Sequence, residues 1–290
     1  MPTGRLLKGM KGLYSVFDGT GTVLCRAGSR LRKGSDKLSA GDMVEFSANP
    51  DGTGFITSIL PRKNSFVRPA VANVDNFVIV TAAASPDPDT MYIDSLAATA
   101  IHAGAEIILV INKTDLRAPS DLLSVYSGTP FRIFCIQADT GCGVGALRAA
   151  LAGSVSVFAG ASGVGKSTLV NALYPGINAE TGGLSDRISR GKNTTRVAEL
   201  YPLTDGGWLA DTPGFTMLEL EQYGFNALSD PADAYPEFAP YIGHCRYRDC
   251  SHTVEEGCAV IDAVNGGKLS PVRHGNYRRM YSVIRSIKNY

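Results

Sequence analysis

The sequence lacks three features, and each absence excludes a class of protein. No apolar run approaches the roughly 20 residues that a helix needs to cross a bilayer. The start, Met1 to Gly12, lacks the apolar stretch of a signal peptide. The six cysteines are not spread as a disulfide framework, since three crowd into one short segment. We therefore expect a soluble, cytoplasmic protein without a membrane partner.

Acidic residues are missing from the end of the chain. Between Gly267 and Tyr290 there are six Lys or Arg and no Asp or Glu. The first 40 residues carry eight Lys or Arg against two Asp, although the formal net charge of the whole chain is only +1. Two basic ends favour a polyanionic partner held from two sides, while ordinary solvated surface remains the alternative.

The N-terminal part predicts a small β barrel. Short strands are expected over residues 7–60, where two turn signals, Asp18–Gly21 and Asn49–Gly52, separate the strand pairs. The expected strands are 11–17, 22–27, 42–46 and 54–59. Their number and length suit a barrel of the oligonucleotide/oligosaccharide-binding kind, with other small barrels left open. We place this domain at residues 1–66.

Beyond Pro69 the pattern changes to alternating strands and helices, which is typical of a doubly wound parallel sheet. Strands are expected at 77–81, 106–111, 132–136, 155–159 and 207–210, and a helix at 90–103. This α/β domain spans residues 67–218. Residues 219–290 then begin with an acidic, proline-rich stretch that resembles a linker, followed by a cysteine cluster and a basic helical tail.

One segment matches the P-loop pattern, G-x4-G-K-S, between an expected strand and an expected helix. Glycines let backbone N–H groups surround phosphates at a helix N-terminus. Lys166 can reach the β- and γ-phosphates, and the Ser167 hydroxyl can ligate Mg²⁺. A glycine-rich turn without a ligand is the alternative. The expected contacts are Gly160, Ala161, Ser162, Gly163, Val164, Gly165, Lys166, Ser167 and Thr168.

Residues from two further segments point to a guanine nucleotide. Asn112, Lys113 and Asp115 follow an apolar strand, and one carboxylate there can accept from guanine N1–H and its exocyclic amine, a pair that adenine lacks. The segment could otherwise be a polar helix cap. The Ala138 N–H is placed for guanine O6.

A further motif concerns the metal ion and the phosphates. Asp211 can hold Mg²⁺, and the Gly214 N–H can sense the γ-phosphate.

The order of these motifs is circularly permuted. Guanine recognition precedes the P-loop, and Asp211–Gly214 comes last. The same sheet can form if the old termini are joined and the chain is opened elsewhere, because termini often lie close together.

Three cysteines and one histidine near the C-terminus have metal-ligand spacing. They are Cys245, Cys250, His252 and Cys258. Three thiolates and an imidazole match a closed tetrahedral zinc site without an open position for catalysis. A disulfide is the competing interpretation. The other histidines His102 and His274 are expected on helix surfaces.

Together these motifs resemble the RsgA (YjeQ/YloQ) family, the circularly permuted GTPases of small ribosomal subunit biogenesis. The resemblance covers nearly the whole chain. It implies an assembly factor that binds the immature small subunit, contacts its rRNA through the barrel and zinc module, and hydrolyses GTP to GDP when docked. Nothing demands more than a monomer.

The chain departs from this family's pattern in its switch segment. The family usually has Gly-Arg/Lys-His-Thr-Thr, whereas Asn193 stands here in place of the histidine, before Thr194 and Thr195. Asparagine can orient a water but cannot take its proton. Phe215 follows Gly214 where Ras-like proteins have the water-orienting glutamine, so we expect slow intrinsic hydrolysis that a partner accelerates.

Two other functions remain open. A P-loop ATPase or small-molecule kinase is opposed by the guanine motif. A nucleic-acid-binding module with a vestigial P-loop is opposed by the intact Lys166, Ser167 and Asp211.

Overall fold

The computed structural model describes residues 1–10, 12–29, 31, 37–67, 70–175, 198–211 and 231–288. Its chain forms two compact units, each assembled from segments that are distant in sequence. The first comprises Met1–Phe77, Leu147–Phe158 and Ser167–Phe215, and the second comprises Val78–Ala146, Ala159–Lys166 and Thr216–Tyr290. Among the described helices, none combines the length and the apolar character that crossing a bilayer requires.

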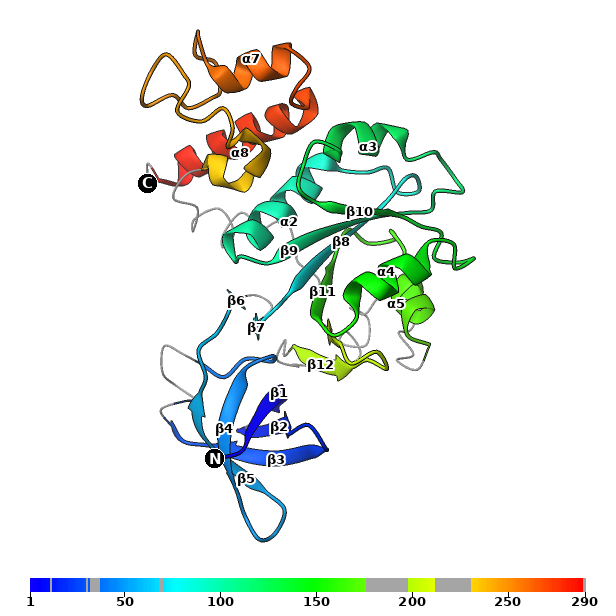
Figure 1. The fold of residues 1–290 in the computed structure, drawn as a ribbon, viewed down its shortest axis with the longest axis vertical. Helices are drawn as coiled ribbons and strands as arrows, with labels where there is room; N and C mark the ends of the chain where they lie inside the picture. Colours follow the sequence, from blue (N-terminus) through cyan, green and yellow to red (C-terminus); the bar gives the residue numbers. More distant parts are fainter. Residues whose placement is uncertain are drawn as a thin grey trace. The chain divides into compact units, whose positions relative to one another are not determined.

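The first unit begins with a closed five-stranded barrel (Figure 1). Its strands are β1 (Thr3–Met10), β2 (Leu13–Phe17), β3 (Thr22–Ala27), β4 (Met43–Ala48) and β5 (Gly54–Ile59). They follow the order β1-β2-β3-β5-β4, with β3 and β5 parallel. Alternate residues point inward and form a small apolar core that includes Val16, Val44 and Ile56. The predicted barrel is confirmed, and β1 is an additional strand.

The turn between β2 and β3 shows why the chain reverses there. The Asp18 carboxylate accepts the N–H groups of Thr20 and Gly21, both at 2.8 Å. A short polar side chain therefore satisfies the backbone of the turn. After the barrel, β6 (Ser65–Val67) and β7 (Ala70–Ala72) form a small antiparallel hairpin.

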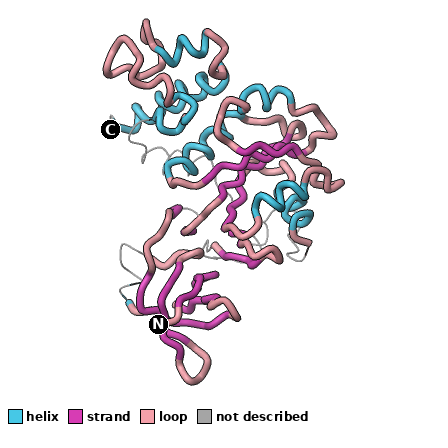
Figure 2. Tube along the Cα trace, viewed as in Figure 1, coloured by secondary structure: helices cyan, strands magenta, loops and turns pink. Residues whose placement is uncertain are grey.

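A six-stranded sheet has the order β10-β9-β8-β11-β13-β12. Figure 2 draws the strands in magenta and the helices in cyan. Its strands are β8 (Asn76–Ala82), β9 (Glu106–Asn112), β10 (Arg132–Cys135), β11 (Val155–Ala159), β12 (Glu199–Pro202) and β13 (Trp208–Asp211). All residues of β8 and β11 are buried, as parallel strands covered on both faces require. The edge strand β12 pairs antiparallel with β13, which the expected parallel sheet did not include.

Among the residues that the structure describes, four helices alternate with these strands. They are α2 (Thr90–His102), α3 (Ser120–Tyr126), α4 (Val144–Leu151) and α5 (Lys166–Leu173). The start of α2 is fixed by Asp89, whose carboxylate accepts the Tyr92 N–H at 3.0 Å. The α/β architecture is therefore as predicted.

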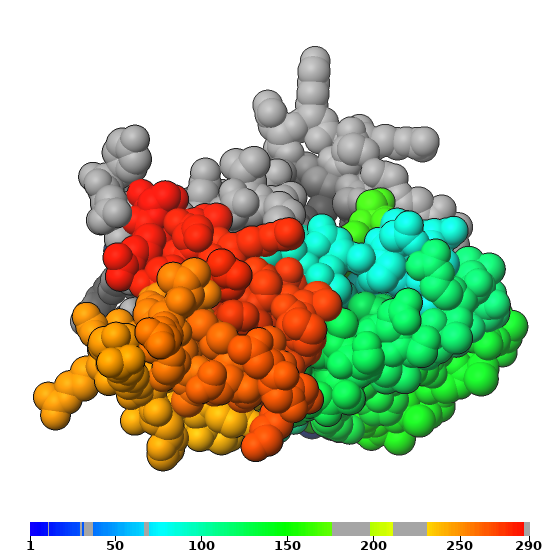
Figure 3. All heavy atoms as spheres, turned by 90° about the horizontal axis from the view of Figure 1, so that it is seen from above, coloured from blue at the N-terminus to red at the C-terminus, as the bar shows by residue number. Residues whose placement is uncertain are grey.

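The C-terminal module belongs to the second unit and is mostly helical. It contains two 3-10 turns, η2 (Pro231–Ala234) and η3 (Pro236–Phe238), and the helices α7 (Ala259–Asn265) and α8 (Pro271–Lys288). Figure 3 shows its orange and red residues lying directly against the cyan and green residues of the α/β part. A common apolar core unites them, since Ala98 of α2 belongs to the same cluster as Tyr277 and Met280 of α8.

The prediction of a linker is wrong for residues 231–238. Tyr235 and Phe238 are buried, with rings stacked at 5.1 Å, and both contact Tyr277. Proline fits the first position of a helical turn, because its missing N–H is not needed there. The prolines of this segment thus begin short turns that carry aromatic side chains into the core.

Candidate functional site

The loop between β11 and α5 approaches its neighbours so closely that glycine is required at two positions. At Gly160, φ is 151°, and a Cβ would lie 2.1 Å from the Val80 oxygen. At Gly165, φ is 94°, and a Cβ would lie 2.3 Å from Asn112 Nδ2. Any other side chain would push this loop away from β8 and β9. The glycines therefore fix the path of the loop as well as its turn.

Lys166 begins α5 and folds back over the loop. Its Nζ donates to the carbonyl oxygens of Gly160 at 2.8 Å and Ala161 at 2.6 Å. Burial lowers the pKa of this amine. A cation held above a loop of backbone groups at a helix N-terminus is suited to an anionic ligand. Ser162 and Gly163 of the same loop are exposed.

Asn112 joins the P-loop to the loop that follows β10. The side chain is only 3% exposed. Its Nδ2 donates to the Val164 oxygen at 2.9 Å, and its Oδ1 accepts the Ala138 N–H at 3.0 Å. One side chain therefore holds together three segments that are far apart in the sequence.

Lys113 makes a second connection to the P-loop. It adopts a left-handed conformation, with φ of 58°. Its Nζ donates to the Gly163 oxygen at 2.8 Å and also to the Ser85 oxygen. Sequence reasoning missed Ser85, which lies in the loop after β8 and carries no motif of its own. Its contribution is a backbone oxygen, which any residue could supply.

The predicted donor to guanine O6 is engaged within the protein. The Ala138 N–H is given to Asn112, so a contact with a base would require Asn112 to release it. Asp115 is exposed on the turn that follows Lys113. The structure thus exposes Asp115 and engages the Ala138 N–H in an internal hydrogen bond.

The residues predicted near Mg²⁺ are only partly described. Ser167 and Thr168 lie in the first turn of α5 and are half-buried. Asp211 is the last residue of β13, where its partner across the ladder is Glu199. Asn193, Thr194, Thr195 and Gly214 lie outside the described residues.

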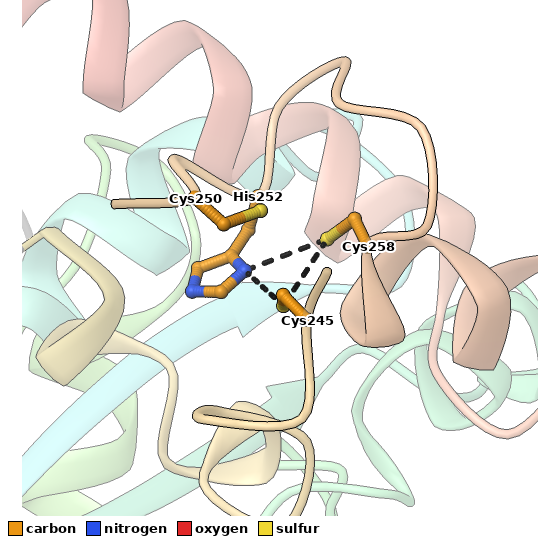
Figure 4. A group of neighbouring side chains, drawn as sticks. All are labelled: Cys245, Cys250, His252 and Cys258. Atoms are coloured by element: carbon orange, nitrogen blue, oxygen red, sulfur yellow. Dashed lines mark hydrogen bonds between the residues drawn. The ribbon is translucent and has the colours of Figure 1, made fainter. Parts of the chain in front are cut away.

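The structure brings the four predicted metal ligands together in one cluster (Figure 4). The ligand atoms of Cys245, Cys250, His252 and Cys258 all lie within 4.8 Å of one another. Nδ1 of His252 is 3.4 Å from the Cys245 sulfur and 3.5 Å from the Cys258 sulfur. The sulfurs of Cys245 and Cys258 are 3.9 Å apart. These cysteines are free, which removes the disulfide interpretation.

These distances fit a tetrahedral zinc site. With Zn–S of about 2.3 Å and Zn–N of about 2.05 Å, the tetrahedral edges are about 3.8 Å between sulfurs and about 3.6 Å from sulfur to nitrogen. The observed separations of 3.9, 3.4 and 3.5 Å among Cys245, His252 and Cys258 agree with these edges, and the Cys250 sulfur lies within 4.8 Å of the other three ligand atoms. Three thiolates and one imidazole form a closed, soft donor set, which is typical of structural zinc.

Polar contacts hold the cluster's loop in place. The Glu255 carboxylate accepts the N–H groups of Ser251 at 2.9 Å, Thr253 at 3.0 Å and Val254 at 3.1 Å. Burial raises the pKa of Glu255, but hydrogen bonds from Ser251 and Val254 outweigh it and lower the pKa to about 2. The carboxylate therefore stays ionised and organises the loop at neutral pH.

Helix α8 also contacts the backbone of this loop. The Tyr277 hydroxyl donates to the Ser251 oxygen at 2.5 Å. The ring of His274 is 2.7 Å through Nε2 from the His252 oxygen, and its side chain is buried. The expectation that His274 lies on a helix surface is wrong, because its position on α8 faces the cluster's backbone.

A buried ionic network fastens α8 to α2. Arg273 is 1% exposed and donates to Asp94 at 2.6 Å and to Glu237 at 2.8 Å. Asn276 and Tyr126 donate to the same Asp94 carboxylate at 2.8 and 2.9 Å. Although burial lowers the pKa of Arg273, the Asp94 and Glu237 carboxylates raise it above its ordinary value. The charge is thus retained inside the protein.

Replacing Arg273 by leucine is expected to lower the free energy of unfolding by about 3–5 kcal/mol, because the buried Asp94 loses its cationic partner. The measurement is urea unfolding of the full chain followed by circular dichroism. Arg278→Leu, at an exposed position of the same helix, is the matched control and should change stability by no more than about 0.5 kcal/mol. Equal midpoints for the two variants would contradict the assignment.

A groove of about 660 Å³ runs along the other side of α8. Three of its lining side chains are the arginines Arg278, Arg279 and Arg285, and the guanidinium of Arg285 lies 5.2 Å from the centre of the Tyr281 ring. Exposed Val254 of the cluster's loop also lines it. A concave surface with three cations and an aromatic ring suits a polyanion that also offers flat, apolar faces.

Comparisons with known proteins agree with this geometry. The RsgA GTPase family model matches residues 59–221, and the RsgA N-terminal domain model matches residues 3–56. The small ribosomal subunit biogenesis GTPase RsgA of Ruminiclostridium cellulolyticum is 40% identical, over 100% of this chain and 96% of the relative. The protein of the same name from Moorella thermoacetica is 40% identical over 94% of each chain.

Two solved structures share the fold. YjeQ from Thermotoga maritima gives a TM-score of 0.80 at 31% identity, over 98% of each chain. YloQ, described as a circularly permuted GTPase, gives a TM-score of 0.78 at 28% identity, over 100% of this chain and 96% of that chain. With barrel, permuted α/β sheet and cysteine cluster all present, the chain belongs to the RsgA GTPase family.

Proposed function

We propose that this protein hydrolyses GTP to GDP and phosphate while bound to the immature small ribosomal subunit, and that the subunit stimulates the hydrolysis. One observation carries the proposal: Asn112 and Lys113 of the guanine motif are both bonded directly to the P-loop. A base contact and a phosphate contact are therefore held in one fixed arrangement. The relatives' name, small ribosomal subunit biogenesis GTPase, supports the choice of partner.

Each motif has a definite role in this proposal. Lys166 exchanges its loop carbonyls for the β- and γ-phosphates, where its charge is better compensated. Asp115, exposed beside Lys113, accepts from guanine. An amide nitrogen carries two hydrogens, so Asn112 can keep its bond to Val164 and still donate to the base. The Ala138 N–H exchanges Asn112 for guanine O6.

The Ser167 hydroxyl would hold Mg²⁺, with Asp211 acting through water. When bound, the ion would neutralise phosphate charge during hydrolysis. The rest of the catalytic apparatus comes from the segment with Asn193, Thr194 and Thr195 and from the Gly214 N–H. Because asparagine cannot accept the proton of water, the free protein hydrolyses GTP slowly, and docking on the subunit orients the attacking water.

Zinc in the Cys245–Cys258 cluster has a structural role. The four cluster residues would hold the metal, which would cross-link a loop to the start of α7, and four protein ligands would leave no position for a substrate. The arginine groove of α8 lies next to this loop and offers the module's contact to rRNA phosphates. The basic sequence of the barrel offers another such contact. The protein acts as a monomer.

The test is phosphate release from GTP and from ATP, each with and without purified small ribosomal subunits. We expect phosphate release from GTP but not from ATP, because the guanine motif excludes adenine. Release from GTP should rise at least tenfold with subunits, because Asn193 leaves the free enzyme slow. Preference for ATP would refute the guanine site. Flat, slow GTP turnover with normal subunit binding would refute stimulation, and Asn193→His would then test whether a proton acceptor restores it.

A further inference from the structure

The β12–β13 hairpin ends in the proposed nucleotide site. It begins at Glu199 and ends at Asp211, the residue proposed to act on Mg²⁺ through water. The register pairs Glu199 directly with Asp211. A displacement of this hairpin would therefore move the backbone of the proposed Mg²⁺ residue Asp211.

The barrel contacts both ends of this hairpin within the first unit. At one end, Lys8 of β1 forms an ion pair of 2.7 Å with Glu199, the residue opposite Asp211. At the other end, the Phe17 ring of β2 meets Trp208 edge-on, with centroids 5.2 Å apart. The guanidinium of Arg5 lies 5.8 Å from the Trp208 ring centre.

The aromatic contact holds the hairpin to the barrel more strongly than the ion pair does. Lys8 and Glu199 are 49% and 31% exposed, and solvent screens such pairs. Phe17, Arg5 and Trp208 are only partly exposed. Burial lowers the pKa of Arg5, while the charge of Asp75 opposes this shift, so the cation beside the indole is substantially withdrawn from water. Trp208 is thus held by barrel residues on β1 and β2.

We propose that Phe17 and Arg5 are positioning residues that couple the barrel to the nucleotide site through Trp208 and β13. This inference rests on the proposed function, because it assumes that Asp211 responds to GTP. RNA bound by the barrel then acts on the hairpin that ends at Asp211. Conversely, the nucleotide changes the environment of Trp208.

Tryptophan fluorescence reports on this contact directly, because Trp208 is the single tryptophan of the chain. Emission spectra of the full chain are recorded with saturating GDP and with a non-hydrolysable GTP analogue, and calorimetry verifies that both bind. We expect the two wild-type spectra to differ and Phe17→Ala to remove at least half of the difference. Phe55→Ala, at an exposed barrel phenylalanine, is the matched control and should keep it. Phe17→Leu, which retains apolar volume, should reduce the difference and serves if the alanine variant does not fold.

A second readout separates positioning from a merely structural role. At saturating subunits, Phe17→Ala should lower the stimulated kcat at least fivefold while basal turnover and subunit affinity stay within twofold of wild type. Identical wild-type spectra with both nucleotides bound, or an undiminished difference in Phe17→Ala, would overturn the coupling alone. Absence of guanine nucleotide binding would overturn the proposed function as well. A wild-type protein with distinct spectra but no subunit stimulation would retain the coupling and refute only the stimulation.

Discussion

Replacing Cys258 by alanine is expected to abolish stoichiometric zinc binding and to unfold the loop between Cys245 and Cys258, while GTP binding persists. The Cys258 sulfur is one of four ligand atoms, and its side chain is 1% exposed. Zinc sites of this class contribute about 10–16 kcal/mol of binding free energy at neutral pH, so losing a ligand removes the principal cross-link of the loop. The measurements are metal content and limited proteolysis.

The expected result is local because α8 has other supports. Its Tyr277 and Met280 belong to an apolar core shared with α2, and Arg273 pairs with Asp94. Cleavage should therefore appear within residues 245–258 and not within α8. Cys142→Ala, at an exposed cysteine outside the cluster, is the control and should retain one zinc per chain. Full zinc content in Cys258→Ala, or unchanged protection of the loop, would contradict the assignment.

Local signals in the sequence were sufficient for several strands. The bounds of β3, β5 and β11 are those predicted, because each combines apolar or alternating residues with a turn beside it. Strand β1 was missed, since its two glycines and two cations hide the alternation. Strand β12 was also missed, because it has only four residues and ends in proline. Neither strand is distinguishable without its partner across the sheet.

Long-range polar contacts could not be predicted. Asp94 and Arg273 are 179 residues apart and belong to no motif, yet they form the buried ion pair between α2 and α8. The aromatic contact of Phe17 with Trp208 spans a similar separation. Such pairs form because the fold brings distant segments together, and no local pattern in the sequence marks the two partners.

The candidate site was predictable to the level of motifs but not of internal hydrogen bonds. The four cluster residues meet because their spacing within 14 residues restricts them to one loop and the start of one helix. The partner of the Ala138 N–H could not be foreseen, because either Asn112 or a guanine oxygen satisfies that donor. Local spacing thus predicts which residues meet, whereas competition between acceptors is decided by the folded geometry.

Replacing Lys166 by alanine is expected to weaken GTP binding by about 10- to 100-fold, because hydrogen bonds from a charged group contribute about 1.5–3 kcal/mol and each 1.4 kcal/mol is tenfold. Phosphate release at saturating GTP should fall by at least about 100-fold, since the same amine stabilises charge that develops in the transition state. Calorimetry with a non-hydrolysable GTP analogue and steady-state phosphate release measure the two effects.

The structure also predicts that this loss is confined to the nucleotide site. The Lys166 amine bonds only to carbonyls of its own loop among the contacts described, so its removal leaves the barrel and the zinc cluster intact. Zinc content and circular dichroism should match wild type. Lys63→Ala, which removes an exposed lysine paired with Asp75, is the matched control and should keep normal turnover. Normal GTP turnover in Lys166→Ala would refute the P-loop assignment, because no lysine would then be needed where the phosphates are proposed to bind.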